Sequence, residues 1–91
     1  MPEEKIKVTV RFLTIMQKYS GDKREVEVDV PSEPHLAVEH IIKRFRIPWK
    51  DYLEKSIRIF INKEHGNTFI EKGEPLQEGD VITFIPISGG G

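Results

Sequence analysis

The stretch KIKVTVRFL (residues 5–13) alternates between apolar and polar side chains, which is the period of a β-strand with one buried face. A second alternating run, EVEVDV (residues 25–30), follows a turn segment that contains Gly21. The apolar face of the first run is Ile6, Val8, Val10 and Phe12, and that of the second is Val26, Val28 and Val30. We predict that the two runs form an antiparallel hairpin.

The next segment, VPSEPHLAVEHIIKRFRIP (residues 30–48), changes to the period of a helix. Its apolar residues at spacing i, i+3, i+4 and i+7 are Val38, Ile41, Ile42 and Phe45. Ser32 is the expected N-cap, and Pro34 is compatible with the first helical turn. Ile47-Pro48 is expected to end the helix, because the residue before a proline disfavours helical geometry.

The second half of the chain returns to strand-like patterns. Its segments are a connector (49–56), an alternating strand IRIFIN (57–62), a turn KEHGN (63–67), an expected short strand TFI (68–70), a polar crossing with Leu76 in the core (71–80) and a last strand VITFIPI (81–87). This order predicts an α+β fold in which a mixed sheet of four or five strands wraps one main helix. Parallel pairing of the first and last strands would give the β-grasp, or ubiquitin-like, roll. The order alone also permits other α+β topologies.

Composition narrows the functional classes. A chain of 91 residues makes one domain, which we expect to span residues 1–86 with a flexible glycine tail at residues 87–91. There is no cysteine, and the net charge is −1 with acidic and basic residues interspersed, so nucleic acid is not an expected partner. No apolar run nears a membrane span and the N-terminus does not resemble a signal peptide, so we expect a cytoplasmic protein without membrane association.

The sequence offers no self-contained catalytic or metal site. The histidines are His35, His40 and His65, and the first two are five residues apart, whereas two metal ligands on a helix prefer a spacing of four. No nucleophile elbow or phosphate-binding loop is present. We therefore expect no bound metal or cofactor and no catalytic side chains of its own.

The glycine tail, Gly89 to Gly91, is the feature that points to chemistry. Residues without a Cβ can enter a narrow channel and let another backbone or a nucleotide approach closely. The terminal carboxylate, ionised at neutral pH, can attack the α-phosphate of ATP to give an acyl-adenylate. A sulfur donor or an amine can then displace AMP. The competing interpretation is a frayed terminus without function.

The chain resembles the MoaD group, the small subunits of molybdopterin synthase. The resemblance covers nearly the whole length and is most specific at Asn62 after a strand, at PLQEGD (residues 75–80) before the last strand, and at Phe84 with PISGG (residues 86–90). It implies a β-grasp sulfur carrier. An activating enzyme would use ATP to adenylate the terminal glycine, sulfur would replace AMP to give a thiocarboxylate, and the tail would donate that sulfur to a pyranopterin precursor of the molybdenum or tungsten cofactor.

The resemblance also assigns residues and partners. Gly89 and Gly90 match the family's diglycine, and Gly91 lies one residue beyond it, so the activated end is Gly91 itself or is exposed by trimming. The residues expected to contact partners are Gly89, with Ser88, Ile87 and Pro86 as the tail stem, and Phe84, Phe69 and, by alternation near the tail, Phe60. The expected partners are the large synthase subunit, in a heterotetramer, and the activating enzyme.

Three alternative functions share this sequence pattern. A related carrier could supply sulfur for thiamine synthesis or tRNA thiolation. A ubiquitin-like modifier would pass the same adenylate to a lysine, forming an amide. A plain interaction module would need none of the tail chemistry, so that deleting Gly89 to Gly91 would leave its function intact.

Overall fold

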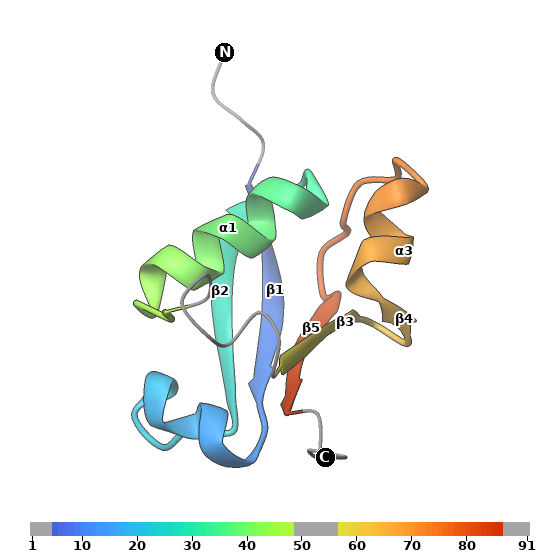
Figure 1. Cartoon of the computed structure of the whole chain (residues 1–91). Coiled ribbons are helices and arrows are strands. Elements are labelled where there is room, and N and C mark those ends of the chain that lie inside the picture. The colour runs from blue at the N-terminus through green and yellow to red at the C-terminus, as the bar shows by residue number, and fades with distance from the viewer. Residues whose placement is uncertain (1–4, 49–56, 87–91) are drawn as a thin grey trace.

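A computed structural model describes residues 5–48 and 57–86 (Figure 1). The predicted connector at residues 49–56 and the tail at residues 87–91 lie outside the described residues. The elements are β1 (Lys5–Phe12), the 3-10 helix η1 (Thr14–Ser20), β2 (Glu25–Pro31), α1 (Pro34–Arg44), β3 (Ile57–Ile61), β4 (Glu64–His65), α3 (Gly66–Glu71) and β5 (Val81–Pro86). The strands form one sheet in the order β2-β1-β5-β3-β4.

The predicted hairpin and the predicted pairing of the first and last strands are both confirmed. β1 and β2 pair antiparallel, with Val10 opposite Val26 and Val8 opposite Val28. β1 and β5 pair parallel, with Val10 beside Ile82. The five-stranded mixed sheet carries α1 across one face, and α3 packs beside β3 and β4 (Figure 1). This is the β-grasp arrangement that the element order permits and that the resemblance implied.

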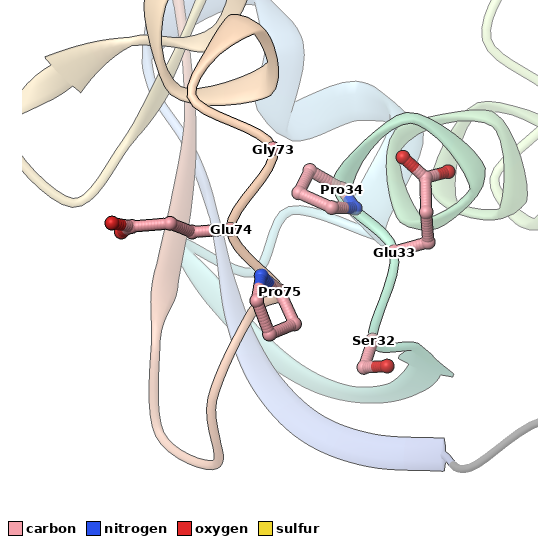
Figure 2. A pocket seen from close by; sticks show the side chains of 6 residues that line it. All are labelled: Ser32, Glu33, Pro34, Gly73, Glu74 and Pro75. Atoms are coloured by element: carbon pink, nitrogen blue, oxygen red, sulfur yellow. The ribbon is translucent and has the colours of Figure 1, made fainter.

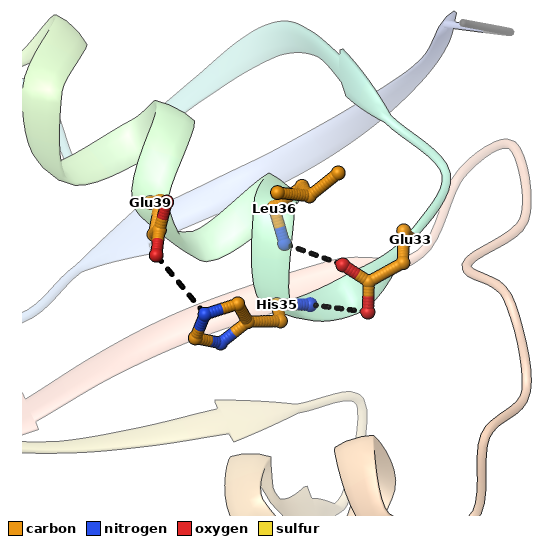
Figure 3. Close-up of polar contacts among 4 residues, drawn as sticks. All are labelled: Glu33, His35, Leu36 and Glu39. Atoms are coloured by element: carbon orange, nitrogen blue, oxygen red, sulfur yellow. Dashed lines mark hydrogen bonds and ion pairs between the residues drawn. The ribbon is translucent and has the colours of Figure 1, made fainter.

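Helix α1 confirms the predicted helix but not its cap. Glu33, rather than Ser32, is the N-cap: its carboxylate accepts hydrogen bonds from the main-chain N–H groups of His35 (3.2 Å) and Leu36 (2.9 Å) (Figure 3). The carbonyl of Ser32 instead accepts a hydrogen bond from the N–H of Leu76 at 2.7 Å. Ser32 is therefore tied to the crossing before β5, and the helix begins one residue later than a Ser32 cap would place it.

The expected strand at residues 68–70 is wrong, because these residues belong to helix α3. The short strand of this region is β4, which pairs antiparallel with β3 just before the helix. Gly66 begins α3 where a Cβ would lie only 3.1 Å from the main-chain oxygen of Ile59, so the chain passes close to β3 at that point. The helix turns Phe69 inward, where it is 8% exposed.

The core lies between α1 and the sheet. Its buried apolar residues are Val8, Val10, Phe12, Met16, Val28, Val30, Ala37, Ile41, Ile47, Ile57, Ile61, Phe69, Leu76, Ile82 and Phe84. Leu76 was predicted to reach the core from the polar crossing, and this is confirmed. Phe12 stands at the centre of an aromatic group, stacked on Phe84 at 5.6 Å between ring centroids and edge-on to Phe45 at 5.0 Å. These rings join the first strand, the helix end and the last strand.

Candidate functional site

The strand that leads to the predicted tail lies inside the sheet. β5 pairs on one side with β1 and on the other with β3, where Ile57 is opposite Pro86. Main-chain pairing therefore holds β5 to its last residue. The predicted stem residues Ile87 and Ser88 and the glycines Gly89, Gly90 and Gly91 lie outside the described residues, so what the structure defines is the anchor from which they extend.

Asn62 fixes the beginning of β5. Its main-chain N–H donates to the carbonyl of Val81 at 2.7 Å, and its side-chain Oδ1 accepts from the N–H of Val81 at 3.0 Å. Asn62 has a φ of 57°, in the left-handed region that asparagine tolerates better than most residues. One residue thus ends β3, starts the turn into β4 and binds both main-chain groups of the first residue of β5.

The crossing before β5 ends in a turn that sets where the strand starts. The Asp80 carboxylate accepts a hydrogen bond from the Gln77 N–H at 2.9 Å, and the Asp80 N–H donates to the Gln77 carbonyl at 3.0 Å. Gly79 has a φ of 87°, and its N–H donates to the carbonyl of Lys7 at 2.9 Å. The turn is therefore closed on itself and joined to β1, and it delivers the chain to its place beside that strand.

The structure separates the three aromatic residues predicted to contact partners. Phe84 is 0% exposed and stacks on Phe12, so its ring is part of the core. Phe69 is also buried, on α3. Phe60 is half-buried, and its ring lies 4.7 Å from that of His65. Of the three rings, Phe60 has the most accessible surface, and the partner contacts of all three stay predictions.

The sheet face opposite α1 carries one row of side chains across all five strands. From β2 to β4 the paired residues in this row are Glu25, Arg11, Thr83, Phe60 and His65. Arg11 Nε and a Glu25 carboxylate oxygen form an ion pair at 3.0 Å. Thr83 is buried although it lies on this face, because the longer side chains of Arg11 and Phe60 flank it. The row places a cation, an apolar ring and an imidazole on the face from which the predicted docking residue Phe60 projects.

The rest of the described surface holds no comparable constellation. No group of three or more His, Cys, Asp or Glu side chains within residues 5–48 and 57–86 could hold a metal ion. His35 pairs through Nε2 with Glu39 at 3.0 Å on the exposed side of α1 (Figure 3). A shallow groove of about 270 Å³ is lined by Ser32, Glu33, Pro34, Gly73, Glu74 and Pro75. Figure 2 shows the side chain of Glu74 pointing away from Pro34, so the polar groups of the groove do not converge.

A family model of ThiS proteins matches residues 10–91, which is most of the chain and includes β5, the stem and all three terminal glycines. The chain belongs to the ThiS family. It therefore has the ubiquitin-like fold of the sulfur-carrier group that its resemblance to MoaD proteins implied. No curated protein matches the sequence.

Three solved structures similar to this ThiS-family chain come from archaea. The small archaeal modifier protein 1 of Methanosarcina acetivorans has a TM-score of 0.71 at 19% identity, covering 97% of this chain and 99% of its own. A Pyrococcus furiosus protein, provisionally described as subunit 1 of a molybdopterin converting factor, has a TM-score of 0.63 at 25% identity, covering 89% and 97%. A Haloferax volcanii protein has a TM-score of 0.67 at 12% identity, covering 96% and 88%.

Two features of this ThiS-family site were not identified from the sequence. Asn62 was noted as part of the resemblance, but its partner Val81 is 19 residues away and no local pattern connects the two. Asp80 was noted only as part of the polar crossing and of PLQEGD, although an aspartate side chain can accept a hydrogen bond from the main chain three residues before it and so close a turn. None of the helices in residues 5–48 and 57–86 combines the length and apolar character that a membrane crossing requires.

Proposed function

We propose that this protein is a sulfur carrier that delivers sulfur to a pyranopterin precursor in molybdopterin synthesis. The observation that carries the proposal is the match to the ThiS family through Gly91, together with a last strand that pairs with β1 up to Phe84 and with β3 up to Pro86. The similarity to the Pyrococcus furiosus protein, at 25% identity, favours molybdopterin as the destination of the sulfur.

The chemistry takes place at the terminal glycine. A carboxylate oxygen of Gly91, or of Gly90 after trimming, attacks the α-phosphorus of ATP and displaces pyrophosphate. A sulfur donor at the oxidation level of sulfide then attacks the carbonyl carbon and displaces AMP, leaving a thiocarboxylate. Transfer of that sulfur to the pterin, with water as the second reactant, restores the carboxylate. The adenylation requires an ATP-dependent activating enzyme, and the transfer requires the large synthase subunit.

The fold of the carrier contributes position rather than catalysis. Five residues after Pro86 reach at most about 17 Å when fully extended, so the domain must dock close to the active site of its partner. Ordering a glycine-rich tail costs roughly 1–2 kcal/mol for each residue, so the tail needs a second contact that offsets this cost. The sheet face around Phe60 is available for that contact, whereas Phe84 acts from within the core to hold β5 in place.

The first test is the intact mass of the protein, purified from its native host without reducing or alkylating agents. We expect a population in which one terminal oxygen is replaced by sulfur, localised by fragmentation to Gly91 or Gly90. Incubation of that population with the purified large subunit and the pterin precursor should return the carboxylate and yield a dithiolene. A thiocarboxylate that is consumed only in a thiamine or tRNA reaction would overturn the molybdopterin assignment and keep the carrier.

The modifier function is the second candidate, because the Methanosarcina acetivorans modifier protein shares the fold over nearly the full length of both chains. In this case the adenylated glycine is attacked by a lysine Nζ, which displaces AMP and forms an amide. Proteolysis of the host proteome followed by mass spectrometry would show lysines that carry the terminal glycines. Such conjugates, disappearing when Gly89 to Gly91 are deleted, would establish the modifier role beside or in place of sulfur transfer.

A further inference from the structure

The outer edge of β2 has the geometry of a strand-binding site. β2 is the first strand of the sheet, with β1 on one side, and no strand within residues 5–48 and 57–86 pairs with its other side (Figure 1). An edge strand presents main-chain N–H and C=O groups that another extended chain can pair with.

The β1–β2 register shows which residues present those groups. The Phe12 N–H donates to the Arg24 carbonyl at 2.8 Å, which marks a hydrogen-bonded pair. Such pairs recur at every second residue of an antiparallel ladder, so Val26, Val28 and Val30 direct their main-chain groups toward β1. The residues between them direct theirs outward, and these are Glu25, Glu27 and Asp29.

The same three residues place their carboxylates on the face away from α1, because they alternate with the inward-facing valines. All three side chains are exposed. Glu25 has a partner in Arg11, but Glu27 and Asp29 make no ion pair with any residue of the described part of the chain. The outward main-chain groups and the unpaired negative charges therefore belong to the same positions.

We infer that the outer edge of β2 binds an extended strand of a partner protein that carries Lys or Arg at alternate positions. In an antiparallel pair with β2, these cations lie directly opposite the acidic residues, where opposite charges are favourable. The inner edge of β2 already accepts such a strand: in β1, Lys7 is opposite Asp29 and Arg11 is opposite Glu25. A second copy of β2 is a poor occupant, since it would place carboxylates opposite carboxylates.

Pro31 sets the length of this site. It is the last residue of β2 and lies in the outward-facing register, but it has no N–H to donate. The ladder available to a partner therefore runs over residues 25–29, which favours a short segment. This interaction is separate from the proposed sulfur transfer, because it uses the outer edge of β2, whereas β1 and β5 lie between β2 and the strand β3 that carries Phe60.

The probe for this site is a capped synthetic peptide with the sequence KIKVTVRF, copied from residues 5–12, because β2 is known to pair with that sequence. It is titrated into the full-length ¹⁵N-labelled protein, and amide hydrogen exchange is followed by NMR. We expect slowed exchange at the amides of Glu25, Glu27 and Asp29. The amides of Val26 and Val28, already bonded to β1, should change little.

Two controls separate strand pairing from general charge attraction. A peptide with glutamate at its three basic positions should not bind. In the β1 register the double variant Glu27→Lys with Asp29→Lys reverses the pair between Asp29 and the second lysine of the peptide, and it places a second lysine opposite the peptide's threonine. It should weaken binding about fivefold. The matched control, Glu71→Lys with Glu78→Lys, makes the same change in net charge at exposed positions outside β2 and should bind as the wild type does.

Three results would overturn the inference. Unchanged exchange at the three outward amides would mean that the acidic row only protects the edge from pairing. Equal weakening by both double variants would mean diffuse electrostatic attraction. A concentration-dependent dimer in sedimentation, abolished by Glu27→Lys with Asp29→Lys and not displaced by the peptide, would assign the edge to a second copy of this chain.

Discussion

Single residues at the two ends of β5 decide how firmly that strand is held. Asn62 combines a left-handed backbone with a side chain that accepts from Val81, so it contributes through both its conformation and its hydrogen bond. Phe84 contributes through burial against Phe12. These two contributions can be measured separately, because substitutions exist that remove one while leaving the other.

Substitutions at Asn62 should rank in a defined order. Asn62→Gly keeps the positive φ without strain and loses only the side-chain hydrogen bond, so it should lower the free energy of unfolding by about 1 kcal/mol. Asn62→Ala loses the bond and also strains the backbone, for a total of about 2–3 kcal/mol. Asn62→Asp keeps an acceptor oxygen and should lie near the wild type. Urea unfolding would check this ranking, and alanine as stable as glycine would contradict it.

Phe84 and Phe60 should differ sharply in what their removal costs. Phe84→Ala removes a ring that is 0% exposed and should lower the free energy of unfolding by about 3–5 kcal/mol. Phe84→Leu, which fills most of the space, should cost about 1 kcal/mol. Phe60→Ala, at a half-buried position, should also cost about 1 kcal/mol. The measurement is chemical unfolding of the three variants, and a Phe84→Ala protein as stable as Phe60→Ala would contradict the packing described.

The variants Phe60→Ala and Phe84→Leu also test which of the two rings contacts a partner. Phe60→Ala remains folded, so any loss of affinity for the large subunit would reflect a direct contact of that ring. Phe84→Leu keeps the core filled, and we expect it to bind the large subunit with unchanged affinity. Isothermal titration of both variants would show the difference, and a loss confined to Phe84→Leu would return the docking role to Phe84.

At the scale of the elements, the N-terminus of α1 depends on one carboxylate. Glu33→Ala leaves the N–H groups of His35 and Leu36 without a side-chain partner and should lower the free energy of unfolding by about 1 kcal/mol. Ser32→Ala is the matched control and should be close to neutral, since only the Ser32 main chain is bonded. Thermal unfolding monitored by circular dichroism would compare them. A larger loss in Ser32→Ala would restore serine as the cap.

The elements also show how far sequence patterns extend. The alternation of apolar and polar side chains along the sequence identified β1, β2, β3 and β5, because each of these strands is long enough to show it. It failed at residues 68–70, since three residues cannot distinguish a strand from a helical turn. In the structure these residues belong to α3, and Phe69 is buried. Ser32 is the better N-cap by preference, but the bond from Leu76 fixes its main chain elsewhere. That contact joins segments far apart in sequence and leaves no local signal.

The candidate site was predicted unevenly for a similar reason. The glycine tail is a composition signal and is visible in the sequence. The alternation of side chains in β5 places Phe84 on the same face as Ile82. Near the end of a strand, however, the pattern does not show whether other residues pack over that face. Phe84 is buried because the fold brings Phe12 from β1 against its ring, and Phe45 from the end of α1 against Phe12.

At the scale of the whole molecule, the domain and the tail should be thermodynamically separate. The pairing of β5 ends with Pro86 opposite Ile57, so deleting residues 87–91 should change the free energy of unfolding by less than about 0.5 kcal/mol. The same deletion should abolish thiocarboxylate formation. Urea unfolding and intact-mass analysis of the truncated protein would test both statements, and a stability loss above about 1 kcal/mol would show that the tail packs on the domain.

The parallel pairing of β1 and β5 has a mechanical consequence. The chain enters the sheet at one end of β1 and leaves at the opposite end of β5, so traction between the termini slides the two strands past each other along their length. All of the hydrogen bonds between them then carry the load together instead of opening one at a time. A force applied to the tail by a partner enzyme therefore loads these hydrogen bonds in shear. The domain should stay folded under such a force while the tail enters a narrow channel.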